Sequence, residues 1–215
     1  MRLSVALPPS DRLALGLTPV VALSPDGSRL AYVANRAGTN QLYVRPIDRL
    51  EATAIPGTEG AESPFFSTDG QSLGFFAEGK LKKVSLSGGA ALTLCSAAAV
   101  RGASWGPDDN IILTPSFSSG LFRVSAAGGT PKPLTILDRK KGEASHRWPE
   151  ILPGGKAVLF TNWSGGANFD DSRIAVQSLE TGERRTLLEG GHLRPLCALG
   201  SPGLCPRGRT ARGAL

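Results

Sequence analysis

Three consecutive residues, His146, Arg147 and Trp148, form the most function-like cluster in this 215-residue chain. Histidine offers a ring that titrates near neutral pH, arginine offers a planar cation, and tryptophan offers a large aromatic face. Such groups suit contact with a ligand, and we predict a binding site here. The sequence leaves an alternative open, in which Trp148 packs between structural units while Arg147 pairs with a carboxylate.

Motifs that would support catalysis or cofactor binding are missing from the sequence. The stretch Gly74–Leu81 nearly spells a phosphate-binding loop, but Leu81 replaces the Ser or Thr that would hold magnesium. No G-x-S-x-G nucleophile motif occurs, and the two histidines, His146 and His192, have no metal-ligand spacing. We therefore predict that the protein is not an enzyme and that it has no catalytic residues, no cofactor and no metal.

The net charge of +6 is concentrated at one end of the chain. Residues 190–215 carry four arginines and no acidic residue, which leaves 20 basic and 18 acidic residues for the rest. This near-balance gives no basic face of the kind that binds nucleic acid, so we predict no nucleic-acid partner. No apolar run approaches the roughly 18 residues of a membrane-spanning helix, and the N-terminal apolar stretch is too short for a signal peptide.

Four segments of the chain share one pattern of short apolar strands around a tight turn. The turn position holds Asp26, Asp69, Asp108 and Gly154, at spacings of 43, 39 and 46 residues. A period near 40 residues with several short strands is typical of β-propeller blades. The 27 glycines and 16 prolines fit the many turns that such blades need. The sequence therefore predicts an all-β fold with about four consecutive four-stranded blades of a β-propeller.

The residues of the first turn, Ser24-Pro25-Asp26-Gly27, explain why the chain turns at this point of the repeat. Proline fixes φ at the first central position, aspartate tolerates the second, and glycine closes a type I turn. The second repeat keeps the closing glycine as Gly70. We therefore interpret the residues of these turns as structural.

The motif S-P-D-G-x-x-L-x-[YF], at Ser24–Tyr32, resembles the repeat of TolB-like and WD-repeat-like bacterial β-propellers. The segment His146–Phe160 and hairpins of the form S-x-x-G-G strengthen the resemblance, which covers about residues 15–190. It is closest to the propellers that lie C-terminal to bacterial serine/threonine kinase domains. The resemblance implies a larger ring of about six to eight blades, so the ring would be open or incomplete here.

The resemblance implies a binding, scaffold or sensory module with a protein or peptide partner, and the missing blades of the parent propeller as further partners. Kinase activity is not implied, because the chain holds no glycine-rich nucleotide loop, no H-R-D motif and no D-F-G motif. The alternative is the propeller of a prolyl-oligopeptidase-like peptidase that lacks its hydrolase domain. The kinase-linked resemblance also implies an extracytoplasmic, periplasmic location, although the sequence shows no export signal.

We divide the chain into a lead-in segment (1–18), which could complete another blade, four repeats, and an aberrant basic tail (192–215). The tail begins where a fifth blade is expected. A one-nucleotide shift of the reading frame at His192 would permit a further strand-turn-strand repeat there, so we predict that the tail is out of frame. A genuine basic tail is the alternative. The four repeats span about 19–60, 61–99, 100–143 and 144–191.

Overall fold

The computed structural model describes residues 12–15, 18–166, 169, 171–194 and 203–206. Most of the predicted lead-in and tail segments lie outside the described residues. The regular structure of those described consists of short antiparallel strands and one turn of 3₁₀ helix, η1 (Arg139–Lys141). Within this part of the chain, no helix has the length and apolar character needed to span a membrane.

The first sheet contains five strands, and β3 lies in its middle. One side of β3 pairs with β4, while β2 and β1 pair with the beginning and the end of its other side. The strands are β1 (Arg12–Leu13), β2 (Val21–Leu23), β3 (Arg29–Arg36), β4 (Thr39–Pro46) and β5 (Thr53–Ala54).

The other three sheets each have four antiparallel strands in sequence order. The second contains β6 (Glu62–Phe66), β7 (Ser72–Ala77), β8 (Lys80–Ser85) and β9 (Leu92–Ser96). The third contains β10 (Ala103–Trp105), β11 (Asn110–Leu113), β12 (Phe122–Ser125) and β13 (Lys132–Pro133). The fourth contains β14 (Ser145–Ile151), β15 (Ala157–Trp163), β16 (Arg173–Ser178) and β17 (Arg184–Glu189). A further pair joins β18 (Gly191–Arg194) to β19 (Gly203–Pro206), and β18 contacts β15 and β16.

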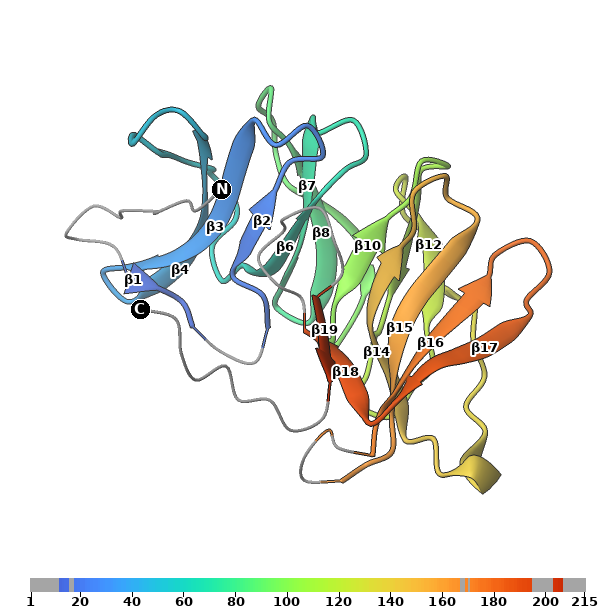
Figure 1. The fold of residues 1–215 in the computed structure, drawn as a ribbon. Coiled ribbons are helices and arrows are strands. Elements are labelled where there is room, and N and C mark those ends of the chain that lie inside the picture. Colours follow the sequence, from blue (N-terminus) through green and yellow to red (C-terminus); the bar gives the residue numbers. More distant parts are fainter. Residues whose placement is uncertain (1–11, 16–17, 167–168, 170, 195–202, 207–215) are drawn as a thin grey trace.

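The four sheets stand side by side like the blades of a propeller (Figure 1). Strands β2, β6, β10 and β14 contact one another in turn, so they form the inner edge of the arrangement. Among the described strands, none of the first sheet pairs with a strand of the fourth, and the sheets form an open arc.

Apolar side chains fill the spaces between neighbouring sheets, because the central strands carry apolar residues on both faces. Phe75 packs toward the first sheet, while the next residue, Phe76, packs toward the third. Ile111 and Ile112 divide in the same way between the second and fourth sheets. Adjacent strand residues point to opposite faces, which explains this division. Full burial of one such side chain stabilises the fold by about 1.5–3 kcal/mol.

The predicted repeat turns join the first two strands of each blade. In the first turn, the Gly27 N–H donates to the Ser24 carbonyl at 2.8 Å, and Pro25 occupies the position between Ser24 and Asp26. The Asp26 carboxylate accepts bonds from the Ser24 hydroxyl (2.5 Å) and the Ser28 hydroxyl (2.7 Å). These bonds hold the pKa of Asp26 far below its usual value. Gly27 has φ = 71°, which is why glycine suits that position.

The second turn repeats this structure, and the last two modify it. Gly70 donates to the Ser67 carbonyl at 2.9 Å, and the Ser67 hydroxyl lowers the pKa of Asp69. In the third turn, Asp108 accepts a bond from the backbone of Asn110 (3.2 Å), and Asp109 rather than glycine has the positive φ of 58°. In the fourth turn the closing residue is Gly155, whose N–H donates to the Leu152 carbonyl at 2.9 Å, so Gly154 holds the position of the aspartate.

Candidate functional site

His146 lies fully buried in β14, with both ring nitrogens engaged. Nδ1 is 2.7 Å from the Thr135 hydroxyl, and Nε2 is 3.1 Å from Oε2 of Glu143. The ring also packs against Phe160, with centroids 4.6 Å apart. Nε2 also lies 3.1 Å from Nη1 of Arg184. A neutral ring protonated on Nε2 donates to Glu143 and accepts from Thr135, whereas one protonated on Nδ1 donates to Thr135 and accepts from Arg184. The Thr135 oxygen in turn accepts the Leu121 N–H at 2.7 Å.

Glu143 is the centre of the polar network around this histidine, and only 5% of its surface is exposed. Its carboxylate accepts bonds from the Asp138 N–H (2.7 Å) and from the Asn162 side-chain amide (2.6 Å). The Arg184 guanidinium forms a salt bridge with it at 3.2 Å. We call these groups, with His146 and Thr135, the Glu143 network. Its buried charge is compensated on every side.

The network keeps His146 neutral at physiological pH. Burial lowers the pKa of His146 to about 4, against the opposing effect of the Glu143 carboxylate. Burial alone would raise the pKa of Glu143, but the Asp138 N–H and the Arg184 charge outweigh it, so that this pKa is lowered. In this arrangement His146 holds the fourth sheet to the segment before it, and the ligand contact predicted for its ring stays untested.

Arg147 is also buried, at 6% exposure, but it is held differently. Its Nε donates to the Ser145 hydroxyl at 2.7 Å, and its guanidinium carbon lies 3.5 Å from the centroid of the Trp163 ring. No carboxylate of the described residues lies within salt-bridge distance of it, in contrast to the ion pair expected from the packing interpretation. Burial, and then the like charge of Arg101, lower the pKa of Arg147 to about 10, so the group stays cationic at neutral pH.

Trp148 occupies a β-bulge at the inner edge of the fourth blade. Its backbone is left-handed, with φ = 51°, and the register of β14 against β15 shifts between Arg147 and Glu150. The Trp148 N–H donates to the Arg101 carbonyl at 2.7 Å, which joins the third and fourth blades through their backbones. Its ring packs against Phe169, with centroids 5.2 Å apart.

The left-handed backbone recurs in the two preceding blades, and the register shift of a bulge recurs in the second blade. A residue with positive φ stands six positions before the turn aspartate or glycine, at Ser63 (52°), Gly102 (96°) and Trp148 (51°). A bulge redirects neighbouring side chains away from the regular ladder. Three charged groups therefore stand at equivalent places on adjacent inner strands. The residues immediately before the left-handed positions are Glu62, Arg101 and Arg147.

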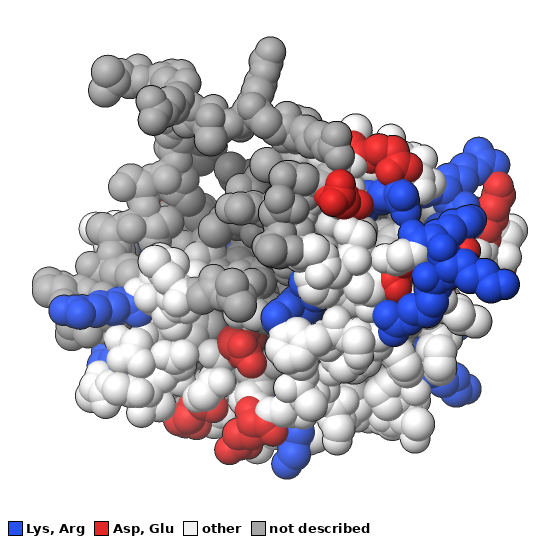
Figure 2. Space-filling model, turned by 90° about the horizontal axis from the view of Figure 1, so that it is seen from below, with Lys and Arg blue, Asp and Glu red and all other residues white. Residues whose placement is uncertain are grey.

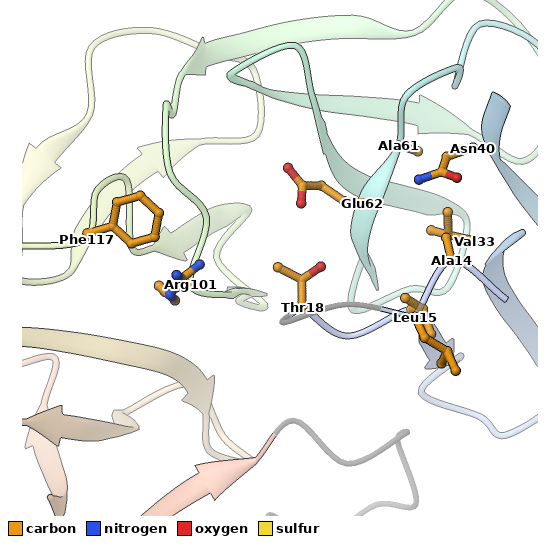
Figure 3. Close-up of a pocket in the computed structure, with 10 residues that line it drawn as sticks. Ala14, Leu15, Thr18, Val33, Asn40, Ala61, Glu62, Arg101 and Phe117 are labelled. Atoms are coloured by element: carbon orange, nitrogen blue, oxygen red, sulfur yellow. The ribbon is translucent and has the colours of Figure 1, made fainter. Parts of the chain in front are cut away.

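A cavity of about 380 Å³ opens among the first three blades, where Glu62 and Arg101 lie (Figure 3). Arg101 and Phe117 form one side of it, and the Arg101 guanidinium carbon is 4.2 Å from the centroid of the Phe117 ring. Leu15 lies on the opposite side. Leu15 and Phe117 expose 79% and 54% of their surface. Exposed apolar side chains beside charged groups are typical of surfaces that bind partners.

Basic side chains gather elsewhere, on the side of the fourth blade, in the view from below the ribbon of Figure 1 (Figure 2). They come from η1 and from the beginning of β17. Many have acidic partners, such as Glu183 at 2.7 Å from Arg185 and Asp138 at 3.6 Å from Lys141. Exposed pairs of this kind contribute little and are mutually neutralised. This gathering of charge therefore differs from the buried, unmatched charge of Arg147.

The described residues contain no group of three His, Cys, Asp or Glu side chains placed to hold a metal ion. Cys95 is a buried thiol, and burial raises its pKa, which disfavours the reactive thiolate. The cavity beside the inner strands offers a ligand the charged side chains of Glu62 and Arg101 and the exposed apolar side chains of Leu15 and Phe117.

Four residues of this site, Leu15, Glu62, Arg101 and Phe117, were not predicted from the sequence. The sequence does hold a signal for Glu62 and Arg101. Each stands seven positions before the turn residue of its repeat, as Arg147 does in the fourth repeat. Aligning the repeats on that turn would have placed them in one column. Phe117 lies in the loop between β11 and β12, which is longer than the equivalent loops of the first two repeats.

Comparison with known proteins gives likenesses in structure. No protein-family model matches the chain, and no curated protein matches it in sequence. TolB from Acinetobacter baumannii superposes with a TM-score of 0.66 at 21% identity, over 80% of this chain and 43% of that one. A TolB-type protein from Agrobacterium tumefaciens gives 0.67 at 18% identity, over 84% and 70%. The β-propeller domain of the Trilobed protease from Pyrococcus furiosus, described as having an open velcro topology, gives 0.53 at 14%, over 82% and 59%.

These likenesses establish the fold. The chain forms β-propeller blades of the kind found in TolB and in the propeller domains of peptidases, and the predicted all-β fold with four four-stranded blades is confirmed. The blades are not closed into a ring within the described residues. This chain spans 43% of the length of the Acinetobacter TolB.

Proposed function

We propose that this chain is a non-catalytic β-propeller module that binds a protein or peptide partner at the cavity beside its inner strands. The observation that carries the proposal is the cavity itself, where Leu15 and Phe117 stand exposed on opposite sides of the charged pair Glu62 and Arg101. Apolar anchors beside a few charged groups can supply both the affinity and the orientation of a bound peptide.

The scaffold supports this role because the charged groups stand at or close to the beginnings of packed strands. Arg101 directly precedes β10, whose neighbour β14 holds it through the Trp148 N–H. Gly102 packs so closely that a Cβ on it would lie 3.0 Å from the Trp148 Cα. A site built on packed strands holds its geometry better than one built on loops alone. Val33 and Asn40, on β3 and β4, also line the cavity. Much of the remainder comes from loops, which tolerate the variation that partner recognition needs.

The proposal extends to the setting of the module, in a larger receptor-kinase-like or TolB-like bacterial protein whose further blades complete the ring. The S-P-D-G repeat motif supports this setting, as does the likeness to TolB. The alternative is the propeller of a prolyl-oligopeptidase-like peptidase. Resequencing the gene from codon 185 onward, read in all frames, separates the two. Further S-P-D-G repeats favour the larger propeller and an out-of-frame tail, whereas a downstream G-x-S-x-G domain favours the peptidase.

Peptide display tests the binding role directly. Peptides are selected from a random displayed library on the whole chain and then measured on three variants by biolayer interferometry. Leu15→Ser and Phe117→Ala remove the apolar sides of the cavity. The control, Gln71→Ala, changes an exposed residue next to the second repeat turn. We expect the selected peptides to lose at least about tenfold in affinity with each cavity variant. They should keep their affinity for Gln71→Ala.

The opposite result would overturn the proposal. If no peptide is enriched, or if all enriched peptides bind the cavity variants as well as the native chain, the cavity is not a binding surface. Circular dichroism of each variant separates lost binding from lost folding. Leu15 and Phe117 are mostly exposed, so both variants should fold normally.

A further inference from the structure

We infer that Arg147 and Arg101 together form a receptor for a carboxylate of the bound peptide. The inference rests on the proposed function and goes beyond it by naming the chemical group that is recognised. Three features of the inner strands support it: an unmatched buried cation, a second cation beside it, and aromatic rings that fix both guanidinium planes.

Arg147 provides the unmatched cation. Of its donors, Nε is bound to the Ser145 hydroxyl, and the two terminal nitrogens have no hydrogen-bond partner among the described residues. A buried guanidinium without an anion is costly, and such groups are normally paired. A carboxylate from a partner would supply the missing anion with two parallel hydrogen bonds.

Arg101 places a second cation nearby. Its carbonyl accepts the N–H of Trp148, the residue that follows Arg147, so the two arginines belong to backbones in direct contact. Among the described residues, Glu62 is the acid whose charge acts on Arg101, and it is exposed and opposes two cations with one charge. The arrangement therefore keeps a net positive charge at the inner strands, and a bound anion would relieve the repulsion between the two guanidinium groups.

Aromatic rings hold both guanidinium planes in place. Arg147 lies 3.5 Å from the Trp163 ring centroid, and Arg101 lies 4.2 Å from that of Phe117. Stacking covers one face of a guanidinium and leaves its nitrogen edge uncovered, which is the edge that binds carboxylates. In Arg101 one nitrogen of that edge, Nη1, donates to the Val100 carbonyl at 2.6 Å, so a ligand would bind its other donors. A group already held in its binding geometry loses little freedom when the ligand arrives.

The exposed apolar side chains next to Arg101 favour a peptide over a free inorganic anion. Phe117 belongs to both features, since it stacks on Arg101 and lines the cavity opposite Leu15. A segment with an apolar residue beside an aspartate or glutamate, or beside its C-terminal carboxylate, would fill both parts at once. Inorganic phosphate would engage the charges alone.

Arginine-labelled protein allows the site to be tested with small defined probes. The whole chain, with ¹⁵N-labelled arginine, is titrated with three short glycine-rich peptides and followed by NMR of the Nε–H groups. One blocked peptide carries Leu-Asp, a second blocked peptide carries Leu-Asn, and a third ends in leucine with a free carboxylate. Inorganic phosphate is titrated as a fourth probe. The comparison between the first and third peptides distinguishes a side-chain carboxylate from a terminal one.

We expect the Leu-Asp peptide or the free-carboxylate peptide to bind at least about tenfold more tightly than the Leu-Asn peptide. Arg147→Gln and Arg101→Gln should each weaken that binding by about tenfold. The matched control Arg185→Gln, at an exposed arginine that pairs with Glu183, should leave it unchanged. Affinity should also fall as salt concentration rises. If Arg147→Gln does not fold, the half-buried Arg101 and the salt dependence still decide the question.

Equal binding of the Leu-Asp, Leu-Asn and free-carboxylate peptides would overturn the carboxylate receptor, as would equal affinity in Arg101→Gln and Arg185→Gln. Phosphate binding stronger than that of either carboxylate peptide would also overturn it. These results differ from failure of the proposed function, because display-selected peptides would still depend on Phe117. If those peptides ignore Phe117 as well, the binding module itself is refuted.

Discussion

His146 and Arg147 are neighbours in one strand, yet their buried polar groups are in opposite situations. His146 belongs to the Glu143 network, in which the carboxylate has four partners and the histidine has three. Arg147 has one hydrogen bond and an aromatic ring, and no anion among the described residues. A buried polar network whose charges are all paired can stabilise the fold. A buried charge without a partner lowers the stability, and its free donors can bind an anion from another molecule. In this strand His146 therefore has the first role and Arg147 the second.

Removing the centre of the network should have the largest effect. Glu143→Ala leaves the Arg184 cation, the His146 ring and the Asn162 amide without their acceptor. We expect a loss of about 3–5 kcal/mol in the free energy of unfolding, as found when one partner of a buried ion pair is removed. Urea denaturation measures it.

The control for this prediction is Glu183→Ala, which removes an exposed carboxylate that pairs with Arg185. Its effect should stay within about 1 kcal/mol. Equal effects of the two substitutions would show that the Glu143 network contributes no more than a surface pair.

Acid should weaken the network in a defined pH range. The pKa of His146 is about 4 in the folded protein and 6.5 in a model peptide. Between these two pH values the His146 side chain is protonated in the unfolded chain and neutral in the folded chain. Stability is therefore expected to fall as the pH drops from 6.5 toward 4, by up to roughly 3 kcal/mol from this residue. The lowered pKa of Glu143 adds a further loss at the acidic end.

Urea midpoints measured at several pH values in the native chain and in His146→Gln check this dependence. The variant should be less stable near neutral pH but should show a shallower slope between pH 6.5 and 4. His192 is present in both proteins, so its titration cancels in the comparison. Identical slopes would mean that His146 is not the group responsible.

Arg147 should contribute the least to stability. Arg147→Met removes a buried cation and its repulsion from Arg101 while it keeps a long side chain over the Trp163 ring. The lost cation–π contact and the relieved burial cost oppose each other, so we expect a change within about 1 kcal/mol. Urea denaturation checks this value. A loss comparable to that of Glu143→Ala would erase the distinction between the two residues.

The sequence alone was sufficient for the blades. The structure of each repeat depends on residues that are close together in the chain. This holds for a type I turn such as Ser24–Gly27 and for the alternating side chains of the strand that follows it. Both faces of the central strands are apolar, which already required packed sheets on both sides. The third and fourth turns depart in detail, because Asp109 and Gly155 take the closing position, yet the period of the repeat was unaffected.

The tertiary structure alone decided which side chains meet. The partners of His146 come from separate segments, with Thr135 before β14 and Arg184 on the last strand of the blade. The proximity of Arg101 to Arg147 depends on the packing of two sheets whose strands are 46 positions apart in sequence. The period of two along a strand predicts which face of the sheet a residue occupies. It does not predict which residue of the neighbouring sheet packs against it. That is why the sequence located the His146–Trp148 cluster, while only the packing of the blades separated a closed polar network from an open cation.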